Sequence, residues 1–223
     1  MEVVYEDNHL LIVNKAVGEI VQGDKTGDEP LVETMKRWLK DKYSKPGNVF
    51  CGVVHRLDRP VAGLVIFAKT SKALTRMNEM FRNGDVKKTY WAIVKKQPVK
   101  AADTLTHYIT SVERNNKSYA SLKEIKGSQK AILEYKTLSR GENYSLLEIR
   151  LLTGRKHQIR VQLSTIGSPI KGDLKYGSQR SNPNGGISLL SRRVQFIHPV
   201  SGEEIDLTAP LPDEPLWHAL YKG

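Results

Sequence analysis

The sequence contains a single cysteine, Cys51, among its 223 residues. An intrachain disulfide and a metal site built from several cysteines are therefore excluded. Cys51 lies in the apolar segment 49–53, which favours a small buried side chain over a nucleophile. The six histidines form no pair at metal-binding spacing with a suitably placed carboxylate. We therefore expect no metal and no other cofactor.

Long apolar runs are also missing. No stretch approaches the roughly 20 residues that a membrane-spanning helix needs. The first residues, 1–6, lack the basic and apolar regions of a signal peptide. We therefore expect a cytoplasmic protein that contacts no membrane. Nothing in the sequence indicates a required protein partner, and a monomer is the default expectation.

The chain has an excess of positive charge. Its 35 Lys and Arg residues outnumber 24 Asp and Glu, which gives a net charge of +11. Nine basic residues against two acidic ones lie between Lys69 and Lys100, and seven against one between Arg150 and Arg180. Such charge attracts polyanions, although it also promotes solubility. Two basic runs that flank the motifs described below favour a groove that follows nucleic-acid phosphates.

The hydrophobic pattern predicts an α+β fold with a mainly antiparallel sheet and flanking helices. Strands are expected at 3–5, 10–13, 63–69, 88–95, 104–109, 131–138, 144–152, 194–197 and 205–207. Helices are expected at 31–43, 71–82 and 156–165, with a last helical turn at 216–221. Because no linker or repeat interrupts the chain, we predict one domain over residues 1–223, with two lobes around a central cleft.

Two short segments concentrate polar residues beside predicted strands. The first is His55-Arg56-Leu57-Asp58, where a following Pro and Gly indicate a loop before a strand. An aspartate in such a loop is also compatible with a simple cap or ion pair. The second segment, 152–160, reads as a strand, a glycine turn and a helix. Arg155 would emerge at the end of that strand.

These segments resemble motifs of the RluA-type pseudouridine synthases, and the resemblance covers nearly the whole chain. The matching segments are His55–Asp58 with Gly63, Lys88-Thr89-Tyr90, Thr153–Arg160, Pro169–Asp173, Lys175–Gly177, His198-Pro199 and, in part, Lys15–Gly18. Their order and spacing agree with the family. The resemblance implies the pseudouridine synthase catalytic-domain fold. No segment corresponds to the S4 RNA-binding domain that many members carry.

The chemistry of the family explains the residue types. Uridine becomes pseudouridine when the N-glycosidic bond breaks, the base turns and carbon 5 joins the sugar. The resemblance assigns the required carboxylate to Asp58 and leaves open whether it attacks the sugar, attacks the base or removes a sugar proton. It also implies that Arg155 pairs with this carboxylate, because a guanidinium remains charged and presents a planar fork. We therefore predict an Asp58–Arg155 ion pair in the cleft.

Further roles follow from the same resemblance. Tyr90 is expected to stack on the target uracil and to assist at carbon 5, unless it only fills the sheet's core. Arg56 is expected to occupy the space of the flipped nucleotide, or to contact phosphate alone. His55, Arg160 and Lys88 are further candidates for substrate binding. For His55 and Arg160, a structural role is the alternative.

The sequence thus predicts an RNA pseudouridine synthase, an isomerase acting on uridines of structured rRNA or tRNA. The alternative is a non-catalytic RNA-binding protein on the same scaffold. A Mg²⁺-dependent phosphoesterase is disfavoured, because no acidic cluster surrounds Asp58 or Arg155. Val61 and Ala62 stand where the family has Thr and Ser, and Ala16 where it has Pro. These differences affect the expected loop geometry more than the expected reaction.

Overall fold

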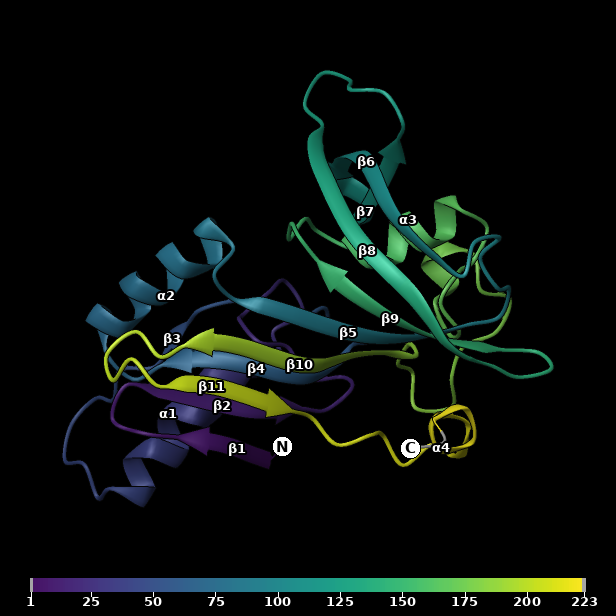
Figure 1. Ribbon diagram of the computed structural model, residues 1–223. Coiled ribbons are helices and arrows are strands. Elements are labelled where there is room, and N and C mark those ends of the chain that lie inside the picture. The colour runs from purple at the N-terminus through teal and green to yellow at the C-terminus, as the bar shows by residue number, and fades with distance from the viewer. Residues whose placement is uncertain (1, 222–223) are drawn as a thin grey trace. The chain divides into compact units, whose positions relative to one another are not determined.

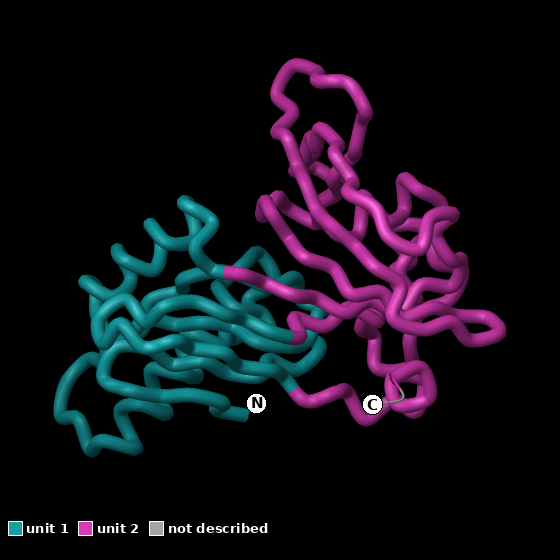
Figure 2. Tube along the Cα trace, in the orientation of Figure 1, with its two compact units in different colours: residues 1–86, 193–209 teal, residues 87–192, 210–223 magenta. Residues whose placement is uncertain are grey.

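The computed structural model describes residues 2–221, which form two compact units (Figure 2). Unit 1 consists of Met1–Val86 and Arg193–Ala209, and unit 2 of Lys87–Arg192 and Pro210–Gly223. Each unit is therefore assembled from two stretches that are distant in the sequence.

Unit 1 is built around two buried strands. β2 (Leu10–Lys15) pairs antiparallel with both β1 (Glu2–Glu6) and β4 (Ala62–Ala68), and β3 (Gly52–Val53) also pairs with β4 (Figure 1). β11 (Glu204–Thr208) pairs antiparallel with β10 (Leu189–Ile197), which crosses from unit 2 into unit 1. The apolar runs 10–13 and 64–68 are fully buried, as expected of strands covered on both faces.

Two amphipathic helices complete unit 1. α1 (Leu31–Lys42) buries Leu31, Val32, Met35 and Leu39, which recur at helical spacing. α2 (Ser71–Asn83) begins after Thr70, whose side-chain oxygen accepts a 3.1 Å hydrogen bond from the Ala73 N–H. It ends at Gly84, where φ is +83°. Both ends of α2 thus follow from ordinary capping preferences.

Unit 2 contains an antiparallel sheet in the order β5 (Lys87–Val94), β9 (Ser145–Leu151), β8 (Gln129–Arg140), β6 (Ala102–Val112) and β7 (Lys117–Ser121). The short 3₁₀ segment η1 (Glu113–Asn115) joins β6 to β7. α3 (Gln158–Thr165) and η2 (Leu174–Tyr176) pack on this sheet through a buried cluster of Ile109, Ala131, Val161 and Tyr176. The last helix, α4 (Pro215–Leu220), buries Trp217.

The α+β class and the antiparallel pairing are confirmed. Two strands were missed: β3 is only two residues long, and β7 is mostly polar. β10 begins at Leu189 and is longer than the predicted 194–197. The predicted helix at 156–165 begins only at Gln158, because His157 has a left-handed backbone with φ +56°. A helix cannot continue through that conformation.

Cys51 is buried, and burial raises the pKa of its thiol to about 12. The prediction of a small buried apolar side chain is therefore confirmed. Among residues 2–221, no helix combines the length and apolar character needed to cross a membrane.

The cap of α2 gives a first test. Thr70→Ala removes the side-chain acceptor for Ala73 N–H and should lower the free energy of unfolding by about 1 kcal/mol. Thr70→Ser keeps the hydroxyl and should remain near wild-type stability. Urea unfolding followed by circular dichroism measures both variants. Equal stability of the alanine and serine variants would contradict the assigned cap.

Candidate active site

The segment 54–61, which joins β3 to β4, presents Asp58 in unit 1. Leu57 is buried, and the half-buried ring of His55 stacks on Phe81 with ring centres 5.0 Å apart. His55 Nε2 also accepts a 3.1 Å hydrogen bond from Ile66 N–H of β4. The other two residues of the motif are more accessible: Arg56 is exposed and Asp58 is half-buried. Alternate residues thus anchor the loop and display its polar groups.

A buried ammonium lies behind this loop. Lys15 is 1% exposed, and its Nζ donates hydrogen bonds to the carbonyl oxygens of Ala16 (2.9 Å), Arg59 (3.2 Å) and Val61 (2.6 Å). These acceptors match the three N–H groups of a protonated lysine. Burial lowers the pKa of Lys15 to about 8, against the opposing fields of Glu19 and Asp58. Lys15 is therefore mainly charged at neutral pH and holds the loop by its carbonyls.

The same loop is closed by local backbone geometry. Val61 N–H donates to the Asp58 carbonyl at 3.0 Å, and Gly18 N–H donates to the Arg59 carbonyl at 2.9 Å. Gly63 has φ +114°, a conformation that suits glycine alone. Val61 is 2% exposed, so the residue that replaces the family's threonine adds to the core.

Unit 2 contains three further candidates. Lys88 and Tyr90 lie on β5, and Arg155 lies in the turn after β9, the strand that pairs with β5. Tyr90 is 6% exposed and lies opposite Ile149 in the β5–β9 register. Lys88 Nζ lies 3.8 Å from the position that a Cβ on Gly154 would occupy. Burial lowers the pKa of Lys88. The structure thus brings Lys88 next to the turn that presents the exposed Arg155.

The side chain of Gln158 fixes this turn by hydrogen bonds. Its side-chain oxygen accepts hydrogen bonds from Thr153 Oγ1 at 2.8 Å and Arg155 N–H at 2.9 Å. Its side-chain nitrogen donates to the Ile132 carbonyl at 3.0 Å, and the residue is 3% exposed. Arg155 Nε donates to the Lys130 carbonyl at 3.0 Å. Both the backbone and the side chain of Arg155 are therefore held against β8.

The left-handed residue His157 is fixed by a second set of contacts. Its Nδ1 lies 2.8 Å from the hydroxyl of Tyr176, which also accepts a 2.8 Å hydrogen bond from Ser118 N–H. Ser118 Oγ in turn donates to the Lys156 carbonyl at 2.8 Å. The missed strand β7 thus supports the segment that follows Arg155.

Arg160, a predicted substrate-binding candidate, is buried in α3. Its Nε and Nη2 donate to the Asp173 carboxylate at 2.7 and 2.9 Å, and its guanidinium lies 5.0 Å from the centre of the Tyr176 ring. Asp173 is 1% exposed. A guanidinium engaged in this buried fork is suited to supporting the site, which was the alternative role.

The sequence-predicted residues therefore fall into two groups. His55, Arg56 and Asp58 share one loop of unit 1, whereas Lys88, Tyr90 and Arg155 belong to unit 2. The Asp58–Arg155 ion pair joins residues of different units and stays a prediction. Sequence reasoning missed Lys15 and Gln158 as positioning residues. Lys15 belongs to the partly matched segment Lys15–Gly18 and Gln158 to the matched segment Thr153–Arg160, but neither was assigned a role.

Comparisons with known proteins agree on one family. A family model described as RNA pseudouridylate synthase matches residues 9–165. An uncharacterised RNA pseudouridine synthase of Synechocystis is 34% identical over 95% of this chain and 66% of its own length. The ribosomal large subunit pseudouridine synthase D of Zymomonas mobilis is 33% identical over 96% of this chain and 70% of its own. The chain thus spans about two thirds of these relatives.

A shorter relative is covered almost completely. The tRNA pseudouridine synthase C of Vibrio parahaemolyticus is 28% identical over 99% of this chain and 94% of its own length. Among solved structures, human RNA pseudouridylate synthase domain containing 4 has a TM-score of 0.81 at 24% identity, covering 98% of this chain and 92% of its own. That likeness concerns the fold.

Lys15 should make stability depend on pH. Its pKa of about 8 in the folded protein is below the ordinary value of 10.5, so the unfolded chain binds more protons between these values. The contribution of Lys15 to the free energy of unfolding should therefore rise as pH increases through about 8 towards 10.5. Lys15→Met should lose about 3 kcal/mol at pH 7, because the loop carbonyls lose their donor.

Chemical unfolding of wild type and Lys15→Met at a series of pH values measures this effect. The gap between the two proteins should widen above pH 8. A constant gap across this range would refute the shifted pKa, and equal stability at neutral pH would refute the loop-anchoring role.

Gln158→Met should destabilise the turn of Arg155, because Arg155 N–H loses its acceptor and the hydrogen bonds from Gln158 to Thr153 Oγ1 and the Ile132 carbonyl are lost. We expect a loss of about 2–3 kcal/mol and faster amide hydrogen exchange at Arg155. Gln22→Met, at an exposed site, is the matched control and should change neither quantity. Unchanged exchange at Arg155 in the Gln158 variant would rule out the clamp.

Proposed function

Because the chain belongs to the RNA pseudouridylate synthase family, we propose that it isomerises specific uridines of structured RNA to pseudouridine, with Asp58 as the catalytic carboxylate. The observation that carries this proposal is the family match over residues 9–165, which includes Asp58, Tyr90 and Arg155. Relatives named for ribosomal large subunit RNA and for tRNA make these the candidate substrates.

Asp58 acts beside the sugar of the target uridine in this proposal. The bond between N1 and carbon 1′ breaks, the base turns, and carbon 5 bonds to carbon 1′ while its proton is lost and N1 gains one. The reaction is an isomerisation, so atoms and electrons balance without a further reactant. A carboxylate held in one position suits this chemistry, and the cage around Lys15 restricts the loop that bears Asp58.

Arg155 is proposed to neutralise Asp58 when substrate is bound. Its Nε is used by the Lys130 carbonyl, so the two terminal nitrogens are the groups that would meet the carboxylate. Gln158 fixes the backbone from which this side chain extends. A guanidinium fixed before substrate binds needs little reorganisation during the reaction.

Arg56 and Tyr90 are proposed to handle the flipped nucleotide. Arg56 is exposed on the loop that anchors itself through its neighbours, which suits a side chain that enters the RNA stack. Flipping costs a few kcal/mol, and a planar cation stacked in the vacated space offsets part of that cost. Tyr90 presents a nearly buried ring on β5, a firm surface for the uracil.

The alternative, RNA binding without catalysis, is favoured only by the net charge of +11. The source organism lacking this gene should be complemented with wild type, Asp58→Asn or Asp41→Asn, and pseudouridine mapped across its total RNA. Asp58→Asn should lower product formation by on the order of 10³-fold or more, because asparagine keeps the shape but loses the charge. Asp41→Asn, on the exposed side of α1, should behave as wild type.

Circular dichroism of the purified variants would establish that both are folded. Equal pseudouridine levels with Asp58→Asn and wild type would eliminate the catalytic role of Asp58. A map unchanged by deletion of the gene would favour the non-catalytic alternative.

A further inference from the structure

The excess positive charge of the chain resides in one unit. Unit 2 contains 21 Lys and Arg against 9 Asp and Glu, a net charge of +12, whereas unit 1 contains 14 against 15, a net charge of −1. Long-range attraction of a polyanion must therefore come from unit 2. Unit 2 accordingly needs places where individual phosphates are held.

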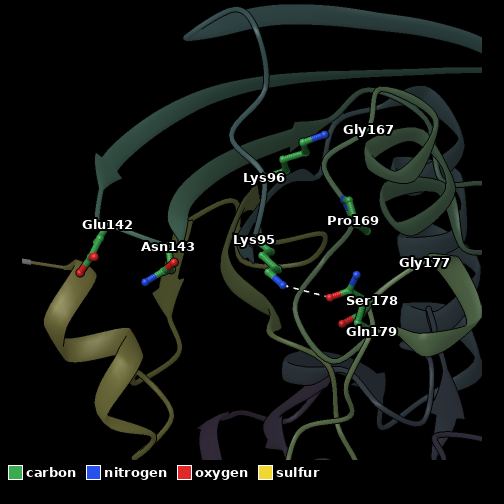
Figure 3. A pocket seen from close by; sticks show the side chains of 9 residues that line it. All are labelled: Lys95, Lys96, Glu142, Asn143, Gly167, Pro169, Gly177, Ser178 and Gln179. Carbon is green, nitrogen blue, oxygen red and sulfur yellow. Dashed lines mark hydrogen bonds between the residues drawn. The ribbon is translucent and has the colours of Figure 1, made fainter.

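A candidate for such a place is a surface groove of about 460 Å³ (Figure 3). Its lining comes from the residues after β5, from the turn between β8 and β9, and from the loops after α3 and η2: Lys95, Lys96, Glu142, Asn143, Gly167, Pro169, Gly177, Ser178 and Gln179. All of these residues belong to unit 2.

The walls of the groove are held by hydrogen bonds of the backbone and of the Ser178 side chain. Ile170 forms an isolated bridge with Val94, and Lys171 N–H donates to the Ile93 carbonyl at 2.9 Å. Ser178 Oγ accepts from Gly172 N–H at 3.1 Å and donates to the Arg180 carbonyl at 3.0 Å. The groove therefore exists before any ligand arrives, which lowers the cost of binding.

The two lysines of the groove retain their charge for a ligand. Lys95 Nζ donates to the neutral side-chain oxygen of Gln179 at 3.1 Å, as the dashed line in Figure 3 marks. Within residues 2–221, the ion pairs of the structure include neither Lys95 nor Lys96. Glu142 lies across the groove from Lys95. Two ammonium groups against one carboxylate leave the groove with net positive charge.

The groove is separated from the residue proposed to stack on uracil. Lys95 follows Tyr90 by five residues along β5 and its end, a separation of about 16 Å for an extended chain. A phosphate bound there would therefore belong to RNA that flanks the reacting nucleotide.

We propose that this groove binds a backbone phosphate of the RNA, with Lys95 and Lys96 as its cationic ligands. The identity of the RNA rests on the proposed function, but the attraction of the groove for phosphate requires no uridine. Glu142 weakens the binding of the same phosphate and limits how tightly flanking RNA is held.

Binding of a uridine-free RNA hairpin, followed by fluorescence anisotropy over a range of KCl concentrations, tests the groove. The double variant K95Q/K96Q should bind on the order of tenfold more weakly at low salt, and its slope of log K against log[salt] should fall by about 0.7–0.9 for each phosphate that is no longer bound. K25Q/K40Q removes the same charge from exposed sites of unit 1 and should stay within about twofold of wild type. Equal losses in the two double variants would overturn the proposal.

E142Q provides a test of opposite sign. Removal of the carboxylate should strengthen hairpin binding several-fold, and unchanged or weaker binding would count against the groove.

In assays of pseudouridine formation, K95Q/K96Q should raise KM and leave kcat at saturating RNA unchanged. If wild type forms no pseudouridine while the binding contrast persists, the proposed function fails and the groove stands; if product forms but the contrast is absent, the groove alone fails.

Discussion

The positive charge of Lys15, buried in a cage of carbonyl oxygens, is the constraint on which the Asp58 loop depends. A lysine is rarely buried, because its ammonium loses hydration. Here the carbonyls of Ala16, Arg59 and Val61 replace water, and two of them belong to the loop itself. The loop therefore cannot move away without exposing or stranding a charge. Rigidity of the loop is in this way coupled to the stability of unit 1.

Unit 2 uses a neutral group for the same purpose. Gln158 satisfies Arg155 N–H, Thr153 Oγ1 and the Ile132 carbonyl with a single amide. The Arg160–Asp173 pair and Tyr176 form a second buried polar cluster in this unit. In each unit, one buried polar side chain near a candidate catalytic residue, Lys15 or Gln158, makes three hydrogen bonds. Such support holds a reactive group in place more firmly than an exposed loop would.

Much of the fold could be predicted from local patterns. The apolar runs 10–13 and 64–68 indicated buried strands, and the helix predicted at 71–82 agrees with α2 to within one residue. β7 escaped because its residues are mostly polar and its partner β6 supplies the context. Asp58, Tyr90 and Arg155 were nominated by motif resemblance. Gln158 lies in the same motif as Arg155, but its contact with the Ile132 carbonyl joins it to a strand 26 residues away and leaves no local pattern.

The division of each unit between two stretches of chain has a consequence for synthesis. The β10–β11 segment completes unit 1 through Arg76, which donates to the Pro199 carbonyl, and through His198, whose Nε2 lies 3.0 Å from Asp7. These contacts form only after residue 199 has left the ribosome. At ordinary translation rates, residues 1–86 wait on the order of ten seconds for that segment. During that interval the nascent polypeptide exposes apolar strand surface, which makes it a natural client for chaperones.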